Sequence, residues 1–238
     1  MRSILYGFMM FAAVACSGTD SATTSGDTTA TATAATETTA SQTQTAEAPM
    51  ASAAPAAEEK EKSMGEYDNK VAELHTTAGE IDIRFYSDVA PNHVKNFIDL
   101  ARQGFYNGTK FHRVIPGFMI QGGDPNTISG SPATWGTGGS PNRLKAEFSG
   151  VPHKRGIVSM ARSSDPDSAS SQFFIVVKDS NFLDRQYSVF GEVTKGMDVA
   201  DKIVNAPRGA MDRPNEPVSI TKIVIRDAKE DEKGSAPQ

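Results

Sequence analysis

The stretch 111–124, FHRVIPGFMIQGGD, combines a lone cation and an amide with large apolar side chains. Arg113, Phe118, Met119 and Gln121 fall within nine residues. If the stretch is extended, Met119 and Gln121 share a face, because side chains alternate along a strand. These four side chains are poorly suited to breaking covalent bonds. They are well suited to binding a small apolar group next to a carbonyl group.

Other site chemistry has little support in the sequence. The four histidines show no paired ligand spacing and the single cysteine, Cys16, lies near the start of the chain, so we expect no metal site. A Gly-x-Ser-x-Gly elbow and a dinucleotide-binding fingerprint are both lacking. We therefore expect no cofactor.

Rotation about an Xaa-Pro amide needs no bond-breaking group. Its barrier is about 18–20 kcal/mol, and the uncatalysed rotation takes tens to hundreds of seconds. In the twisted transition state the proline nitrogen gains lone-pair character, so a guanidinium placed over it donates a hydrogen bond that is weaker in the ground state. An apolar pocket would hold the proline ring while the amide rotates. The residues around Arg113 therefore suit catalysis of this rotation.

Two strands around a tight turn would position these residues. Pro116-Gly117 is a turn pair, since proline presets φ for the first corner and glycine accepts the positive φ of the second. Periodicity predicts further strands at 71–76, 80–86, 157–161, 172–177, 187–193 and 218–226, with helices from 91 to just before Gly104 and at 197–204. About eight short strands with two helices favour a mostly antiparallel sheet, closed into a barrel that the helices cap.

A long segment between Asp124 and Pro152 lacks regular patterning. A loop of this length is uncommon unless it is functional or disordered. Its GTGG run at 136–139 lacks the preceding strand and following helix of a phosphate-binding loop. We interpret these glycines as permitting close approach of the backbone.

The stretch 111–124 closely resembles the signature of cyclophilin-type peptidyl-prolyl isomerases. Four further runs follow in the family's order: GTGG at 136–139, GIVSMA at 156–161, SQFFI at 171–175 and VFGEV at 189–193. With these runs in the family's order, the resemblance extends over nearly all of 70–226. The resemblance implies a closed eight-stranded barrel with two capping helices, and isomerisation of Xaa-Pro bonds without a cofactor.

The resemblance also implies roles for single residues. Arg113 is similar to the catalytic arginine of the family, and Phe118 and Gln121 complete the expected catalytic set, with Gln121 orienting Arg113 and the substrate backbone. Nine residues are expected to bind substrate: Met119, Gly136, Ala161, Arg162, Gln172, Phe174, Phe182, Leu183 and Tyr187. The walls of the proline pocket are expected to be Phe118, Met119, Phe174 and Leu183. Three other aromatic residues are expected in the core: Phe111, Phe173 and Phe190.

The sequence shows three departures from the common family pattern. Phe182 stands where many members have a tryptophan that helps to bind the inhibitor cyclosporin, so we expect weaker inhibition. Tyr187 replaces a histidine that is common in eukaryotic members, and Arg162-Ser163 replaces an Asn-Ala pair along the groove. In all three respects the chain is similar to bacterial members of the family.

The N-terminus has the layout of a secretory signal. Residues 1–15 carry one early positive charge, Arg2, and then an uncharged apolar run that is too short to span a bilayer. The sequence AVAC at 13–16 resembles the processing site of bacterial lipoproteins, in which Cys16 would become the lipidated first residue. The alternative is an ordinary cleaved signal that leaves Cys16 as an incidental thiol.

Composition divides the rest of the chain into a tether, a domain and a tail. In 17–57, 30 of 41 residues are Ala, Ser or Thr, which bury too little apolar surface to fold. We therefore predict a disordered tether at 16–66, either bare or glycosylated, an isomerase domain at 67–227 and a flexible charged tail at 228–238. Residues 67–226 carry 19 basic and 17 acidic side chains, a balance that argues against nucleic-acid binding.

Two hypotheses of different classes follow. The leading one is an exported prolyl isomerase that binds proline-containing segments and speeds the folding of exported proteins. Its domain would be monomeric and lipid-anchored through Cys16, at the periplasmic side of a bacterial membrane. The alternative is a holdase that grips such segments in the same groove with negligible turnover.

Overall fold

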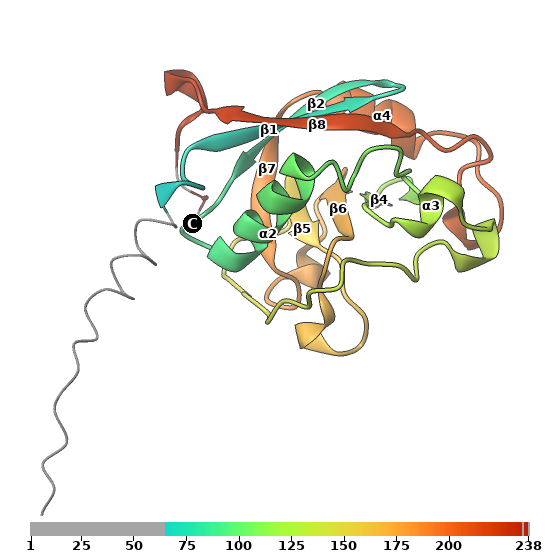
Figure 1. Ribbon diagram of the computed structural model, residues 1–238, viewed down its shortest axis with the longest axis horizontal. Coiled ribbons are helices and arrows are strands. Elements are labelled where there is room, and N and C mark those ends of the chain that lie inside the picture. Colours follow the sequence, from blue (N-terminus) through green and yellow to red (C-terminus); the bar gives the residue numbers. More distant parts are fainter. Residues whose placement is uncertain (1–64, 235, 238) are drawn as a thin grey trace, which may run out of the picture. The chain divides into compact units, whose positions relative to one another are not determined.

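A computed structural model of this chain describes residues 65–234, 236 and 237 (Figure 1). The predicted signal at 1–15, Cys16 and nearly all of the predicted tether at 16–66 lie outside the described residues. Within the described part of the chain, no helix has both the length and the apolar character that crossing a membrane requires.

Eight short strands form one antiparallel sheet. Their bounds are β1 (Lys70–Thr76), β2 (Gly79–Phe85), β3 (Arg113–Ile115), β4 (Met119–Gly122), β5 (Ile157–Met160), β6 (Phe173–Val176), β7 (Val189–Lys195) and β8 (Ile220–Asp227). Neighbouring strands follow the order β3-β4-β6-β5-β7-β2-β1-β8. Each predicted strand range corresponds to one of these strands, and the stretch 111–124 supplies β3 and β4 as a hairpin.

The sheet is open, and the prediction of a closed barrel is wrong. β3 and β8 are the two edge strands, and among the described residues no ladder joins them. An isolated bridge between Lys110 and Ser219 links the segments that precede these strands, together with a backbone hydrogen bond of 3.0 Å from Phe111 N to Val218 O. This contact is confined to a few residues, because the chain enters the β3–β4 hairpin directly afterwards.

The two predicted helices are present, and they pack against the open sheet (Figure 1). α2 (Pro91–Arg102) begins with a proline, which suits a helix start because its missing N–H would have no partner there. The chain leaves this helix at Gly104, with φ of 71°. α4 (Met197–Val204) buries the four apolar residues expected of it: Val199, Ala200, Ile203 and Val204. α2 lies against β7 and β8, and α4 lies against β2 and β4.

Short helical turns punctuate the loops. They are α3 (Asn126–Ser129), η1 (Pro132–Thr134), η2 (Pro166–Ser168), η3 (Asn181–Leu183), η4 (Ala210–Asp212) and η5 (Glu230–Glu232). The first two lie in the long segment for which the sequence indicates no regular structure. The third, fourth and fifth lie in loops between the later strands.

Two apolar clusters receive alternate residues of the central strands. In β6, Phe173 and Ile175 belong to the main core, whereas Phe174 and Val176 belong to a smaller cluster. All four are buried, so the strand is covered on both faces. The three aromatic residues predicted for the core, Phe111, Phe173 and Phe190, are fully buried in the main cluster. The smaller cluster forms the floor of the site described below.

The first part of the C-terminal tail lies against β8. Residues 228–234, predicted to be flexible, contain η5. The Arg226 guanidinium donates to both carboxylate oxygens of Glu232, at 2.6 and 2.7 Å, and Lys229 N donates to the same group at 2.8 Å. These hydrogen bonds lower the pKa of Glu232 to about 2, against an opposing effect of burial. The tail is therefore bound to the domain at this point.

Candidate active site

The β3–β4 hairpin brings the predicted catalytic cation and amide together. Arg113 and Gln121 are directly paired across the two strands, and Arg113 Nη1 donates to Gln121 Oε1 in a long contact of 3.4 Å. The turn forms as predicted: Gly117 has φ of 73°, and Phe118 N donates to Ile115 O at 2.9 Å. Register and turn together hold the exposed guanidinium beside the amide.

A cavity of about 310 Å³ lies beside this hairpin. Ten residues line it: Arg113, Phe118, Met119, Gln121, Ala161, Arg162, Phe174, Phe182, Leu183 and Tyr187. All ten are among the twelve residues that the sequence assigns to the site. Met119 and Gln121 line it together, which confirms the prediction that they share a face of their strand. The cavity lining contains two cations and no carboxylate.

The floor of the cavity is buried and its rim is exposed. Met119, Phe174 and Leu183 are 2, 5 and 6 % exposed, and they come from β4, β6 and η3 respectively. Phe182 is 66 % exposed, and its ring centre lies 5.3 Å from that of the half-buried Phe118. The result is a closed apolar floor with an aromatic pair at the entrance.

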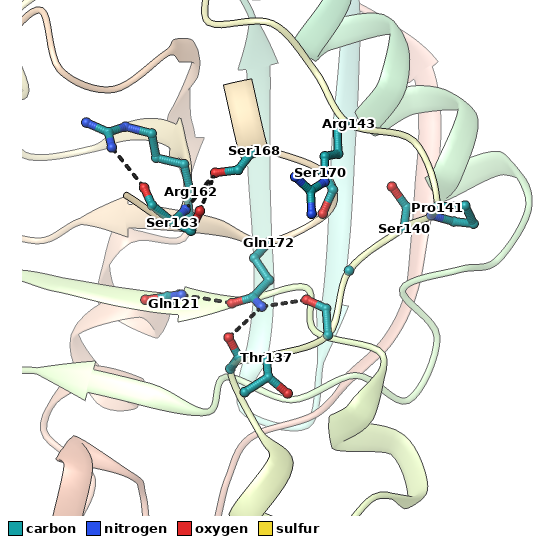
Figure 2. Close-up of a pocket in the computed structure, with 14 residues that line it drawn as sticks. Gln121, Thr137, Ser140, Pro141, Arg143, Arg162, Ser163, Ser168, Ser170 and Gln172 are labelled. Atoms are coloured by element: carbon teal, nitrogen blue, oxygen red, sulfur yellow. Dashed lines mark hydrogen bonds between the residues drawn. The ribbon is translucent and has the colours of Figure 1, made fainter. Parts of the chain in front are cut away.

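A second cavity, of about 460 Å³, adjoins the first and shares Gln121, Ala161 and Arg162 with it (Figure 2). Gln172 lies at its centre and connects the two: its Oε1 accepts from Gln121 Nε2 at 2.9 Å. Its Nε2 donates to the carbonyl oxygens of Gly136 and Gly138 at 3.0 and 2.7 Å. The two remaining predicted residues, Gly136 and Gln172, therefore line this second cavity and not the first.

The glycine run at 136–139 packs closely, as interpreted from the sequence. A Cβ added to Gly138 would lie 2.2 Å from Asp124 Oδ1, and the same carboxylate accepts hydrogen bonds from Gly136 N and from Asn126 N. Only glycine tolerates this approach. Asp124 thus fixes the loop whose carbonyl oxygens hold Gln172.

Arg162 is a fixed wall of both cavities. Its Nε donates to Gln186 O at 3.0 Å and its Nη1 to Ser163 O at 2.8 Å, while its guanidinium carbon lies 4.8 Å from the centre of the Tyr187 ring. These contacts hold the cation in place. Among the described residues, the Arg113 side chain makes only the long hydrogen bond to Gln121. Of the two cations in the lining of the first cavity, Arg113 therefore has the less constrained guanidinium.

Comparison with known protein families identifies the kind of site. Residues 71–225 match the family described as cyclophilin type peptidyl-prolyl cis-trans isomerase/CLD. The chain belongs to the cyclophilin family. It therefore catalyses the cis-trans isomerisation of peptidyl-prolyl bonds, and its matched segment contains both cavities.

Individual relatives agree with the family match. A peptidyl-prolyl cis-trans isomerase of Acinetobacter baylyi is 46% identical over 167 residues, which covers 66% of this cyclophilin and 86% of the relative. Peptidyl-prolyl cis-trans isomerase B of Escherichia coli is 43% identical over 164 residues, covering 64% and 97%. A crystal structure of a Cryptosporidium parvum cyclophilin in the presence of the dipeptide Ala-Pro aligns with a TM-score of 0.60 and 31% identity, covering 66% and 99%.

Some residues that line the two cavities of this cyclophilin were not predicted. Arg143 and Ser170 face the second cavity from irregular segments, and Ser168 faces it from the short turn η2 (Figure 2). Loops of this kind carry no periodic pattern that would mark a side chain as facing a site. Within the described residues, no group of three His, Cys, Asp or Glu side chains is placed to hold a metal ion.

Proposed function

We propose that the 310 Å³ cavity holds the proline ring of the substrate and that Arg113 lowers the barrier to rotation of the preceding amide. One observation carries this proposal: strand pairing places the Arg113 guanidinium at the edge of a cavity whose floor is formed by Met119, Phe174 and Leu183. This apolar floor suits a proline ring, and the cation at the edge of the cavity would face the nitrogen of the preceding amide.

Rotation is accelerated if Arg113 binds the twisted amide better than the planar one. In the planar amide the nitrogen lone pair is delocalised into the carbonyl, whereas in the twisted form it accepts a hydrogen bond from the guanidinium. Stabilisation that appears only in the transition state raises kcat. A reduction of about 5–7 kcal/mol in the barrier corresponds to roughly four to five orders of magnitude in rate.

Gln121 and Gln172 orient the reacting groups. Gln121 accepts from Arg113 and donates to Gln172, which is in turn held by the carbonyl oxygens of Gly136 and Gly138. This line of amides leads from the cation into the second cavity. We assign it the role of aligning the substrate backbone, and we assign Phe118 and Phe182 the role of covering the ring at the entrance.

The position of the bound ring tests this assignment directly. Nuclear Overhauser contacts should join the proline-ring protons of an Ala-Pro peptide to the Met119 and Leu183 methyl groups and to the Phe174 ring. A peptide with alanine in place of proline is the control and should give none of them. Proline contacts with Thr137 in the second cavity, and none with Met119, would show that the assignment is wrong.

We further propose that this isomerase acts on exported proteins. The support lies in the sequence: residues 1–15 have the layout of a secretory signal, and Cys16 stands at a lipoprotein-like processing site. The 16–66 segment then acts as a tether with a reach of roughly 40 Å if it behaves as a flexible coil. The domain works as a monomer in the cell envelope, on proline-containing segments of chains that are still folding.

A further inference from the structure

A buried histidine outside both cavities contacts the elements that form the proline-cavity wall. His153 is fully buried, and no sequence motif assigns it to the site. Its backbone N donates to Asp184 Oδ1 at 2.7 Å, and its Nδ1 lies 3.0 Å from the same oxygen. Because a carboxylate only accepts, Nδ1 carries the proton. Nε2 is then free to accept from the Ser159 hydroxyl, at 2.9 Å.

The same histidine holds both ends of the turn η3. Its carbonyl oxygen accepts from Ser180 N at 2.8 Å, just before the turn, and Asp184 follows directly after it. Between these two anchors lie Phe182 and Leu183, which are walls of the proline cavity. His153 is therefore hydrogen-bonded to Ser180, immediately before the turn, and to Asp184, immediately after it.

The imidazole ring of His153 supports two further walls of the cavity. It stacks on Phe174 at an interplanar angle of 15°, with ring centres 6.2 Å apart, and meets the edge of Tyr187 at 6.5 Å. Phe174 and Tyr187 also pack edge to face on each other, with ring centres 5.6 Å apart. Phe174, Phe182, Leu183 and Tyr187 are thus each in contact with His153 or lie in the turn that it anchors.

The wall needs such an anchor because its chain segment has little regular structure. Between β6 and β7, the three residues of η3 are the only helical or strand element, and Arg185 adopts a positive φ of 61°, which is unfavourable for a non-glycine residue. Neither Phe182 nor Leu183 is held by strand pairing. A binding site needs its walls fixed to about 0.5 Å, and that requires hydrogen-bonded support from behind.

Burial keeps His153 in the form that this network requires. It lowers the pKa of the imidazole, while the hydrogen bond and charge of Asp184 act in the opposite direction without overcoming it. The neutral ring has one donor and one acceptor nitrogen, which match Asp184 and Ser159 respectively.

We propose that His153 is a positioning residue of this isomerase: together with Asp184 and Ser159 it fixes the wall of the proline cavity, and so sets how tightly the ring is bound. The inference rests on the proposed assignment of that cavity to proline. The wall contacts the ring before and during rotation alike, so its loss weakens ground-state and transition-state binding equally. Such a change raises KM and leaves kcat almost unaltered.

The chain offers a matched control for this proposal. His93, in α2, is also fully buried and its Nδ1 lies 2.6 Å from the carboxylate of Glu147, but it lines neither cavity. His153→Ala and His93→Ala remove the same kind of side chain and the same kind of bond. Thermal unfolding of both variants shows how much of any effect is general loss of stability.

Two variants of Asp184 provide a test that does not depend on changing a fully buried residue. Asp184→Ala removes the anchor of η3. Asp184→Asn keeps an oxygen that accepts from His153 N and Nδ1, and it should rescue binding. The assay is exchange NMR on an Ala-Pro peptide, with KM and kcat determined separately for each variant.

We expect KM to rise about fivefold or more in His153→Ala and Asp184→Ala with kcat within about twofold, and to stay near wild type in Asp184→Asn and His93→Ala. An unchanged KM in Asp184→Ala, or equal effects of His153→Ala and His93→Ala, would overturn the inference. The proposed function has a separate test, because it would be wrong if Arg113→Ala isomerised the peptide as fast as wild type does.

Discussion

At the scale of single residues, the site divides into a polar side and an apolar side. Arg113, Gln121 and Gln172 form a line of donors and acceptors, while Met119 and Phe174 form the floor opposite. A proline-containing segment has the same division, since its ring is apolar and its backbone carbonyls accept hydrogen bonds. The recognition of the ring and the catalysis of its rotation are therefore assigned to different side chains.

Removal of the Gln121 side chain should slow turnover without abolishing it. Gln121→Ala leaves Arg113 in place but removes its hydrogen-bonding neighbour, so we expect kcat to fall about tenfold, the lower end for a hydrogen bond to a charged group. Gln172→Ala, which does not touch Arg113, is the control and should change kcat less. Exchange NMR at saturating peptide measures both. A larger fall in kcat for Gln172→Ala would contradict this assignment of roles.

Most of the lining of the first cavity could be predicted because its residues lie in the family motifs or next to them, and Phe182 and Leu183 lie between two of those motifs. The sequence did not predict His153, whose role depends on contacts with residues 180 and 184 about thirty positions away. A lone histidine before a strand has no local pattern that distinguishes a structural anchor from a surface residue. The same is true of Arg143 and Ser170, which reach the second cavity from irregular loops.

At the scale of elements, alternation and turn chemistry explain most of the fold. β6 supplies the main core with one face and the cavity floor with the other, which strand periodicity allows but does not specify. The predicted barrel closure failed because it depends on long-range pairing between the start of β8 and residues 108–111. Secondary-structure propensity and hydrophobic periodicity depend on the local sequence and do not identify such long-range partners. They therefore could not distinguish a short bridge between these segments from a full ladder of paired strands.

The turn after β4 should tolerate no side chain. Gly123 has φ of +83°, and an added Cβ would lie 2.5 Å from Ser171 O. We expect Gly123→Ala to lower the free energy of unfolding by about 1–3 kcal/mol or more. Each kcal/mol lost should lower Tm by about 2–4 °C. Gly150→Ala is the control, because nothing lies within 4 Å of its added Cβ. Equal Tm values for the two variants in thermal unfolding would contradict the account.

Buried histidines should make the domain less stable in mild acid. Burial holds the pKa of His112 below its ordinary 6.5, against an opposing effect of Asp124. At pH values between the His112 pKa of the folded chain and that of the unfolded chain, the unfolded chain binds more protons. The contribution of neutral His112 to stability is therefore fully present above pH 6.5 and is lost as the pH falls through the folded pKa. Urea unfolding at two pH values on either side of 6.5 should show this loss.

His112→Gln separates this contribution from the others. This substitution removes one titrating group. His153 still titrates, and burial lowers its pKa as well. The loss of unfolding free energy on acidification should therefore be smaller in His112→Gln than in wild type, but not absent. An identical loss in the two proteins would show that His112 does not contribute.

At the scale of the whole molecule, the sequence indicates a nearly neutral domain behind an acidic tether. The family match covers residues 71–225, so it does not test the predicted leader and tether. Their composition predicts export and attachment, and the Cys16 side chain is the group that would carry the lipid. The domain's chemistry does not depend on the anchor, because every cavity residue lies between 113 and 187.

Loss of the Cys16 thiol should release the protein from the membrane. In a bacterial host, full-length wild type should sediment with membranes and Cys16→Ser should appear in the soluble fraction, because thioether attachment of a lipid needs the sulfur. Ser21→Ala, a neighbouring change in the tether, is the control and should sediment like wild type. Unchanged partitioning of Cys16→Ser would contradict the proposed anchor while leaving the isomerase assignment intact.

The most direct test of the central claim compares wild type with Arg113→Ala in the same exchange NMR experiment, with peptide affinity and turnover determined separately. If Arg113 acts on the twisting amide, kcat for an Ala-Pro peptide falls about a hundredfold or more while Kd changes by less than about threefold. Equal acceleration of exchange by the two proteins, or a loss that arises entirely from weaker binding, would contradict the account.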